Sequence, residues 1–422
     1  MDESKLGTAA APWPVVVVGA GAAGLWAAWR SASLGARTLV VEKTPRTGTK
    51  VLASGGTHCN LTTTLEPEGA LALFGDRGAR FLARALWNLP PAAVRERFDE
   101  WGVPTVEAPL EKIFPQSGNA RDVRDALERA VRSAGATIRT TAPVAALEPA
   151  PFGWHLVLEG GERIAAARVI LCPGGRSYPR TGTTGDGYGW CTSLDLPLVE
   201  QVPALVPLTS PDAWARELTG IAVQEAEVRL VAPNGRTLGR RRRPVLFTHN
   251  GLSGPGPMDL SEPVARANGG LRIAIDLFPD TEREELRDLL VSGASTRGAP
   301  KVARMLPAPL PARLRAAVFA AAGLEGDDPR CSELDRATRH QLVESLKALH
   351  VRVDGTLGYD KAEVTAGGLD LRVVDPGTMA VRGRQGLFAC GELLDVQGPI
   401  GGLNFQAAFA TAELAGLAAA GD

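Results

Sequence analysis

Six residues near the N-terminus have the spacing of a nucleotide-binding turn. The segment 19–24 reads Gly-Ala-Gly-Ala-Ala-Gly and follows an apolar run at 15–18. In such a turn the first glycine permits a tight bend, the second lets the backbone approach a pyrophosphate, and the third lets a helix pack on a strand. An acid about 20 residues further on can bind ribose hydroxyls. These features predict a dinucleotide site formed by Gly19, Gly21, Ala22, Ala23, Gly24, Glu42 and the adjacent Lys43.

The segments around this turn predict an α/β domain. Residues 15–18 and 38–41 are continuous apolar runs, which are typical of parallel strands covered on both faces. A helix is expected from Asn119, which can cap it, to Ala134. Residues 48–60 are rich in Gly, Ser and Thr and predict a long functional loop. We therefore expect a Rossmann-like domain with a mostly parallel sheet.

The pattern changes after about residue 203 and returns at about residue 350. Residues 222–230 alternate between apolar and polar side chains, as a half-exposed antiparallel strand does. Helical patterns follow at 282–290, 311–322 and 333–349. The sequence therefore predicts a discontinuous first domain, residues 1–205 and 350–422, interrupted by a β-plus-helical insertion at 206–349.

Composition excludes several classes of protein. The 422 residues carry a net charge of −1, which argues against a generally basic nucleic-acid coat protein. Five widely spaced cysteines argue against a zinc ribbon, an iron–sulfur cluster or a disulfide framework, and no spacing predicts a metal site. The uncharged segment 8–29 contains prolines and glycines and follows net negative residues, so it predicts neither a signal peptide nor a membrane span. We expect a cytoplasmic protein with no membrane partner.

Two later segments bear on the choice between NAD and FAD, which the first turn alone leaves open. Residues 168–175 form an apolar run that ends in Pro173-Gly174-Gly175. Residues 386–392 form another, ending in Gly391-Glu392, where an acid can bind a ribityl chain or a pyrophosphate. Gly401-Gly402 then precedes an apolar helix whose N–H groups would face the pyrimidine edge of a flavin. Together these segments favour a flavin.

The order of these motifs resembles the BaiN-like flavoproteins, also called YhiN-type or aminoacetone-oxidase-type FAD-dependent oxidoreductases, within the two-dinucleotide-binding-domain flavoproteins. Beyond the first turn, the motifs that carry the resemblance are residues 54–60, 114–115, 174–175, 181–187, 247–255, 365–368 and 391–395. The resemblance implies FAD, an interrupted FAD domain, and an inserted β-barrel with a helical portion.

The resemblance also implies roles for individual residues. Lys50 would lie near the isoalloxazine or the pyrophosphate, Val144 would meet the adenine, and Glu392 would hold the ribityl chain. The remaining implied FAD contacts are Ser54, Gly55, Gly56, Cys59, Asn60, Pro173, Gly174, Gly175, Gly391, Gly401, Gly402, Leu403 and Asn404. The chain departs from the family at His58, where an arginine is usual, and at Leu403, where a tyrosine is usual.

Two histidines are candidates for catalysis. His249 follows a predicted strand beside a Gly/Pro-rich loop, and His58 lies in the loop implied to touch FAD. The run Arg240–Arg243 is read as a solvated strand, because the net charge is near zero and no aromatic residues are interleaved. We therefore expect a small-molecule substrate and no nucleic-acid partner, and the oligomeric state is left open.

The leading hypothesis is an FAD-dependent oxidoreductase that moves a hydride between flavin N5 and a small organic substrate. The favoured direction is reduction of an activated C=C bond, with NAD(P)H visiting as a transient electron donor. Three alternatives remain: an amine-type oxidase that passes electrons to O₂, a flavin-bound nucleic-acid-modifying factor, and an NAD-dependent dehydrogenase without flavin.

Overall fold

The computed structural model describes residues 6–267, 269–324 and 328–421, which divide into two compact units. The split unit comprises the described residues of Met1–Val202 and Glu363–Asp422, and the inserted unit comprises those of Pro203–Ala362. Each unit has its own hydrophobic core. We describe each unit by itself.

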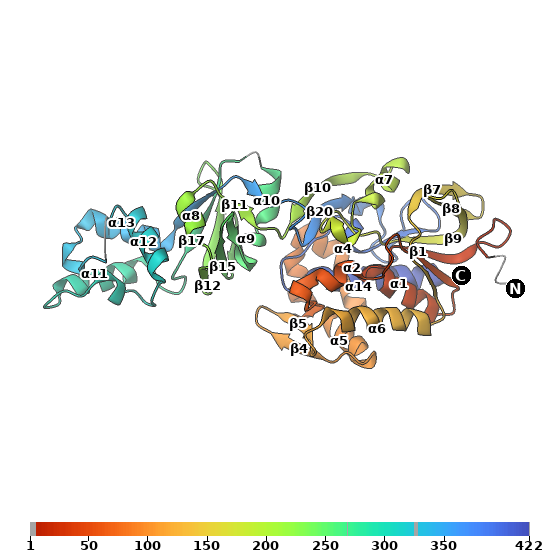
Figure 1. Ribbon diagram of the computed structural model, residues 1–422, viewed down its shortest axis with the longest axis horizontal. Helices are drawn as coiled ribbons and strands as arrows, with labels where there is room; N and C mark the ends of the chain where they lie inside the picture. The colour runs from red at the N-terminus through yellow and green to blue at the C-terminus, as the bar shows by residue number, and fades with distance from the viewer. Residues whose placement is uncertain (1–5, 268, 325–327, 422) are drawn as a thin grey trace. The chain divides into compact units, whose positions relative to one another are not determined.

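The split unit contains a seven-stranded sheet in the order β6-β2-β1-β9-β8-β7, with β21 also pairing with β9. Figure 1 labels β1, β9, β8 and β7 of this sheet. Its strands are β1 (Trp13–Val18), β2 (Thr38–Val41), β6 (Thr137–Arg139), β7 (Val144–Ala150), β8 (Gly153–Leu158), β9 (Arg163–Leu171) and β21 (Leu387–Ala389). β6, β2, β1, β9 and β21 run parallel, whereas β8 and β7 are antiparallel additions. The expected mostly parallel, Rossmann-type sheet is confirmed.

The long strand β9 joins parts of the chain from both sides of the insertion. Its first half pairs with β8, and its last three residues pair with β21, in the register Val169↔Leu387 to Leu171↔Ala389. β1 lies along its other edge. The carboxyl ends of β1, β9 and β21 therefore meet at one edge of the sheet, where ligands bind in open α/β folds.

Helices cover this sheet and supply much of its core. The main ones are α1 (Ala22–Ser33), α4 (Gly75–Asn88), α5 (Pro91–Glu100), α6 (Ala120–Ser133), α7 (Asp186–Ser193) and α14 (Leu403–Ala420). The predicted cap of α6 is confirmed, because Asn119 Oδ1 accepts the N–H of Arg121 at 3.0 Å. α14 packs along α1: Trp26 Nε1 donates to Glu413 Oε2 at 2.8 Å, and Ser31 Oγ donates to the carbonyl of Gly416 at 3.0 Å.

Smaller elements complete the split unit. They are α2 (Thr49–Ala53), α3 (Pro67–Leu71), the three-stranded sheet of β3 (Thr62–Thr63), β5 (Lys112–Pro115) and β4 (Thr105–Ala108), and the pair β10 (Leu198–Ala204) and β20 (Val364–Leu369). Residues 48–60 are not loop throughout as expected, because α2 and a 3₁₀ turn at Ser54–Thr57 lie within them. A five-residue helix is too short to show a hydrophobic period.

The inserted unit contains two sheets and a set of helices. One sheet has the order β12 (Ala222–Val223), β15 (Val245–Thr248), β16 (Gly251–Ser253), β11 (Leu208–Thr209) and β19 (Gly355–Thr356). The other has the order β14 (Thr237–Arg242), β13 (Glu227–Val231), β17 (Leu271–Asp276) and β18 (Leu349–Val353). The helices are α8 (Ala213–Glu217), α9 (Pro255–Met258), α10 (Ser261–Arg266), α11 (Arg283–Ser295), α12 (Ala312–Ala321) and α13 (Arg336–Lys347).

Two expectations for the insertion need correction. The return to the first domain was expected at residue 350, but β18 pairs with β17 in the register Leu271↔Val353 to Ile275↔Leu349, so the split unit resumes only at Glu363. The expected strand at 222–230 is interrupted between Val223 and Glu227. Within the described residues, no helix combines enough length and apolar character to cross a bilayer.

Candidate functional site

The first glycine turn leaves space where a pyrophosphate would lie. Gly19 has a φ of +98°, and an added Cβ there would lie 2.4 Å from the carbonyl oxygen of Cys172. A Cβ on Gly24 would lie 1.8 Å from the Gly19 oxygen, so neither position tolerates a side chain. Around Gly21, by contrast, an added Cβ would meet nothing within 4 Å. The first N–H groups of α1 have no intrahelical partner and suit an anion there.

Glu42, which directly follows β2, is hydrogen-bonded to this turn. Glu42 Oε2 accepts the N–H of Ala20 at 2.7 Å, and Oε1 accepts the N–H and the hydroxyl of Thr44 at 2.8 and 2.7 Å. A carboxylate has about four lone-pair sites, so Glu42 retains capacity for a ribose hydroxyl. The N–H of Ala142 donates to the Glu42 carbonyl at 2.9 Å. This bond brings Val144, the first residue of β7, close to Glu42.

Lys43 is held by a later loop. Its Nζ donates to Asp186 Oδ2 at 2.5 Å and to Thr184 Oγ1 at 2.6 Å. An added Cβ on Gly182 in the same loop would lie 2.6 Å from the Thr44 methyl group. The loop at 182–186 therefore lies against the segment that follows Glu42, and Lys43 positions this loop.

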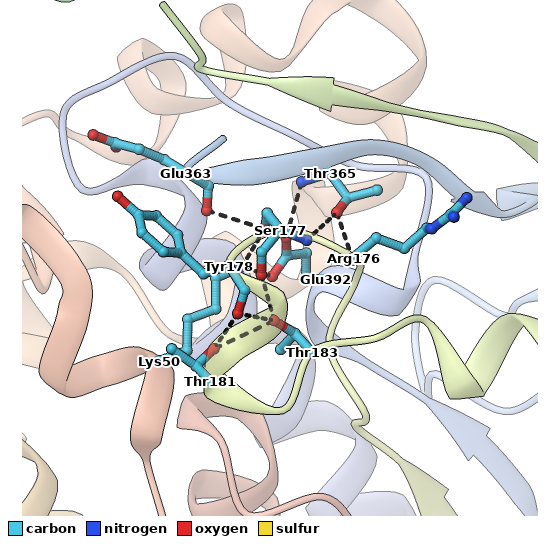
Figure 2. Close-up of polar contacts among 9 residues, drawn as sticks. All are labelled: Lys50, Arg176, Ser177, Tyr178, Thr181, Thr183, Glu363, Thr365 and Glu392. Atoms are coloured by element: carbon cyan, nitrogen blue, oxygen red, sulfur yellow. Dashed lines mark hydrogen bonds and ion pairs between the residues drawn. The ribbon is translucent and has the colours of Figure 1, made fainter. Parts of the chain in front are cut away.

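A polar cluster joins four distant segments of the split unit (Figure 2). Lys50 Nζ donates to Ser177 Oγ at 2.6 Å and forms an ion pair with Glu392. Glu392 Oε1 accepts the Ser177 hydroxyl at 2.8 Å and the N–H of Thr365 at 2.9 Å. Thr365 Oγ1 accepts the N–H groups of Arg176 and Ser177 at 2.8 and 3.2 Å. The Lys50 and Glu392 side chains keep about a fifth of their surface exposed, 22% and 20%.

Two glycines allow the segments of this cluster to approach one another closely. An added Cβ on Gly175 would lie 2.4 Å from Thr365 Oγ1 and 3.0 Å from Glu392 Oε1. An added Cβ on Gly391 would lie 2.8 Å from the Ala23 Cβ at the start of α1. Gly391-Glu392 therefore lies between the first glycine turn and Lys50, as one extended cofactor would require.

Tyr178 follows the cluster in a strained conformation. Its φ is +53°, and its carbonyl accepts the N–H and hydroxyl of Thr181 at 2.8 and 2.7 Å and the hydroxyl of Thr183 at 3.2 Å. Burial, and then the negative charge of Glu363, raise the pKa of the Tyr178 phenol. Figure 2 shows that this phenol and the Glu363 carboxylate point to the same side, away from Ser177.

The segment 54–60 has an unusual backbone. Gly55, Gly56, Thr57 and Cys59 all have φ between +53° and +76°. Non-glycine residues in this region carry strain, which collects at functional sites. His58 Nδ1 lies 2.6 Å from the carbonyl oxygen of Gly118. This bond anchors an otherwise exposed loop.

The ends of this segment are tied into the fold. Ser54 Oγ donates to the carbonyl of Val51 at 2.7 Å, and Asn60 Oδ1 accepts the N–H of Ile113 at 3.0 Å. Burial raises the pKa of the Cys59 thiol to about 12, so Cys59 stays protonated at neutral pH and is a poor nucleophile. These three side chains therefore shape the loop through contacts within the fold, and its exposed part consists of Gly55, Gly56, Thr57 and His58.

The start of α14 lies beside this loop. An added Cβ on Gly402, with φ +82°, would lie 1.9 Å from the Thr62 oxygen. The Asn404 side chain makes two bonds to Gly398, accepting its N–H at 2.9 Å and donating to its carbonyl at 2.8 Å. Leu403 is fully buried. The residues implied for the flavin therefore offer backbone N–H groups at a helix N-terminus rather than side chains.

Within the split unit, the structure brings most of the expected cofactor-binding residues close together. His249 lies in the inserted unit just after β15, with Nε2 3.0 Å from Asn250 Nδ2. Its catalytic role stays a prediction. Sequence reasoning missed the bridging roles of Ser177 and Thr365, although hydroxyl residues close to paired glycines were a visible signal.

Comparison with known proteins places the chain in a family. The model for the HI0933-like protein Rossmann domain matches residues 13–418. A curated relative named 3-dehydro-bile acid delta(4,6)-reductase, from Clostridium scindens, is 30% identical over 96% of this chain and 98% of its own length. One named ribosomal RNA dihydrouridine synthase, from Escherichia coli, is 28% identical over 94% of this chain and 95% of its own length.

Solved structures support the fold. A 3-ketosteroid-Δ4-(5α)-dehydrogenase from Rhodococcus jostii aligns with a TM-score of 0.54 and 18% identity, over 97% of each chain. A 3-ketosteroid Δ1-dehydrogenase from Sterolibacterium denitrificans aligns with a TM-score of 0.53 and 14% identity, over 97% of this chain and 99% of its own. The full-length match to the family model is the stronger finding, and this chain belongs to the HI0933-like Rossmann family.

Proposed function

We propose that this protein is an FAD-dependent oxidoreductase that reduces a carbon–carbon double bond conjugated to a carbonyl group, with NAD(P)H as electron donor. The observation that carries the proposal is the full-length similarity to two differently named relatives. A 3-dehydro-bile acid delta(4,6)-reductase saturates bonds conjugated to a ketone, and dihydrouridine is uridine with its C5=C6 bond saturated. The two names share one chemistry: hydride to the β-carbon and a proton to the α-carbon.

The residues of the split unit fit FAD in an extended conformation. The space at Gly21 and the start of α1 would hold the pyrophosphate, and Glu42 would hold a ribose hydroxyl. Lys50 and Glu392 would hold the ribityl region. The N–H groups at the start of α14 would face the pyrimidine edge, where a helix N-terminus stabilises negative charge. Bound FAD, once reduced by NAD(P)H, would supply the hydride, and the protein supplies orientation and electrostatics.

Tyr178 is the proton donor in this proposal. Protonation of the α-carbon needs an acid that is neutral at working pH and held in place. The Tyr178 backbone is fixed by Thr181 and Thr183, and Tyr178 directly follows Ser177, a member of the Lys50–Glu392 cluster. The raised pKa of its phenol keeps the proton available over a wide pH range. Glu363, on the same side, would return a proton to the phenol after turnover.

Anaerobic half-reactions test the proposal. The purified protein should be yellow, should bleach with NADPH or NADH, and should recover its colour when 4-androstene-3,17-dione, a conjugated ketone, is added. The steroid product should carry two more hydrogens. A protein that bleaches but recovers only with air would be an oxidase. A colourless protein that uses NAD alone would be a dehydrogenase without flavin.

An RNA substrate is the second candidate, because relatives from Escherichia coli and Haemophilus influenzae are named ribosomal RNA dihydrouridine synthase. The run at 240–243 gives it little support, because its charges are compensated. Arg240 Nε lies 3.8 Å from Glu227 Oε2, and Arg242 Nη2 lies 2.5 Å from Asp280 Oδ2. Arg241 and Arg243 both form ion pairs with Asp259. RNA reduction would appear as dihydrouridine in ribosomal RNA incubated with the reduced protein, with binding that weakens steeply as salt rises.

A further inference from the structure

Two cysteines meet where β9 and β21 end. Cys172 directly follows β9 and Cys390 directly follows β21, so they are the next pair after Leu171↔Ala389 in the register of these parallel strands. Their Sγ atoms lie 3.1 Å apart, although 218 residues separate them in the chain. Both are buried: Cys172 is 5% exposed and Cys390 is not exposed. The contact exists because the chain returns to β9 after the insertion.

The backbone geometry suits a covalent link. Neighbouring strands lie about 4.8 Å apart, within the Cα separations of about 4.4–6.8 Å that disulfides span. We propose that Cys172 and Cys390 form a redox-active pair at the carboxyl edge of the central sheet, which closes to a disulfide and is reopened by a dithiol reductant. The inference rests on the two strands and the two sulfurs and does not depend on the proposed function.

Hydrogen peroxide is an oxidant small enough to reach such a pair, and the step balances. The sulfur of Cys172, the more exposed residue of the two, attacks the O–O bond; a sulfenic acid forms and water leaves. The Cys390 sulfur then displaces the second oxygen as water, and the S–S bond forms. Each thiol gives up one hydrogen, and the two electrons reduce the peroxide. Burial and the neighbouring thiol raise the pKa of Cys172, so little thiolate is present and closure is slow at neutral pH.

The link would hold together the two segments that frame the first glycine turn. The Cys172 carbonyl lies against Gly19, and Gly391, directly after Cys390, lies against Ala23. A disulfide here closes a loop that contains the whole inserted unit. Cross-links that close long loops restrict the unfolded chain most. We therefore expect the oxidised protein to unfold at a higher temperature than the reduced protein.

Alkylation mapping tests the pair. The intact protein is treated with hydrogen peroxide, denatured, alkylated, digested and analysed by mass spectrometry, alongside a sample reduced before alkylation. The reduced sample should be labelled at all five cysteines. The oxidised sample should be labelled at three, five minus the two that pair, and should contain one linked peptide joining Cys172 to Cys390.

Matched variants separate this pair from general oxidation. Cys172→Ser and Cys390→Ser should each abolish the linked peptide and the rise in melting temperature, whereas Cys191→Ser and Cys331→Ser, which also remove buried thiols, should keep both. If a serine variant fails to fold, Cys→Ala at the same position replaces it. Labelling of all five cysteines in oxidised wild-type protein, or a linked peptide involving another cysteine, would overturn the proposal.

Discussion

The N–H of Ala20 donates to Glu42 Oε2 over 2.7 Å, so the glycine turn after β1 is fixed to the residue that follows β2. The bond lies inside the turn that would receive the pyrophosphate, and it forms within the protein itself. The turn therefore holds its shape through its own hydrogen bonds and through the packing of Gly19 and Gly24. Substitutions that fill the space in front of it should change ligand binding more than folding.

Gly21→Val tests whether ligand binding can be lost while folding is kept. Gly21 has an ordinary extended φ of −79°, and no atom lies within 4 Å of an added Cβ, so the variant should fold. Its side chain would occupy the space for the pyrophosphate. We expect FAD affinity to fall ~100-fold or more, which corresponds to about 3 kcal/mol. Flavin absorbance after purification and titration with FAD measure the loss.

Gly160→Val is the matched control, because an added Cβ there also meets nothing within 4 Å. It should keep its flavin and its melting temperature. A Gly21→Val protein with a full complement of FAD would contradict the placement of the pyrophosphate.

The Lys50–Glu392 ion pair should show measurable coupling. Lys50→Met, Glu392→Gln and the double variant form a cycle whose coupling free energy we expect to be about 1–3 kcal/mol, because the pair is four-fifths buried and shares Ser177. Urea unfolding of the FAD-free proteins measures it. The exposed pair Arg163–Glu148, with 49% and 46% of each side chain accessible, should give less than about 1 kcal/mol. Equal coupling in the two pairs would argue against a special role for the cluster.

Tyr178→Phe should slow one half-reaction and spare the other. Loss of a general acid costs about 10²–10⁴-fold, so recovery of colour with the conjugated ketone should slow by that factor, while bleaching by NAD(P)H should not change. The chain has two other tyrosines, and Tyr188→Phe and Tyr359→Phe serve as controls that should slow neither step. Slowing of both half-reactions by Tyr178→Phe would indicate a structural role.

The same step should depend on pH with a defined sign. The acid must carry its proton, so the rate should be constant at neutral pH and fall as pH rises through the pKa of Tyr178. Burial and Glu363 raise that pKa above its ordinary value of 10.0, so the fall should come above pH 10. Glu363→Gln removes the negative charge and should move the fall toward lower pH. Stopped-flow reoxidation across alkaline pH measures both.

The stability of the split unit should decrease at acid pH because of Asp370. Its side chain is 6% exposed and is bonded to Arg372 and Arg77. The hydrogen bond from Arg372 is the main cause that holds its pKa below the ordinary 3.8, and Arg77 adds to it. The contribution of the ionised Asp370 carboxylate to the free energy of unfolding is complete above pH 3.8 and is lost as pH falls through the lowered pKa.

Asp370→Asn should therefore cost about 1–3 kcal/mol at neutral pH and make stability less dependent on pH below 3.8. Urea unfolding from neutral to acid pH measures this. Asp280→Asn breaks an exposed pair with Arg242, in which the Asp280 side chain is 74% accessible, and should have little effect at moderate salt. An Asp370→Asn profile that matches wild type at every pH would contradict the assignment.

The glycine turn and the helix cap could be predicted from the sequence. The turn at Gly19–Gly24 and the Asn119 cap depend on residues that are close in the chain. The cluster around Glu392 could not be predicted, because its partners lie as far as 342 residues away and meet only when β21 pairs with β9. The contact between Cys172 and Cys390 has the same origin.

Short elements were the other source of error. The alternating strand at 349–353 follows α13 almost directly, so the sequence pattern extends the helix into its first residue and predicts a domain boundary that is too early. α2 spans only five residues and left no periodic signal. In both cases pairing or packing with distant segments, and not the local pattern, decides the structure.

The split of one unit around the other sets an order of assembly during synthesis. Ribosomes add about 5–20 residues per second, and domains generally fold as units as they emerge. Residues 203–362 are contiguous and carry their own core, so this unit can fold while β9 still has an uncovered edge. β21 and α14 are made only after it. If the proposed FAD site is correct, the nascent chain could retain the cofactor only after these later segments are made, and a chain stalled before residue 387 would have the glycine turn but would bind FAD weakly.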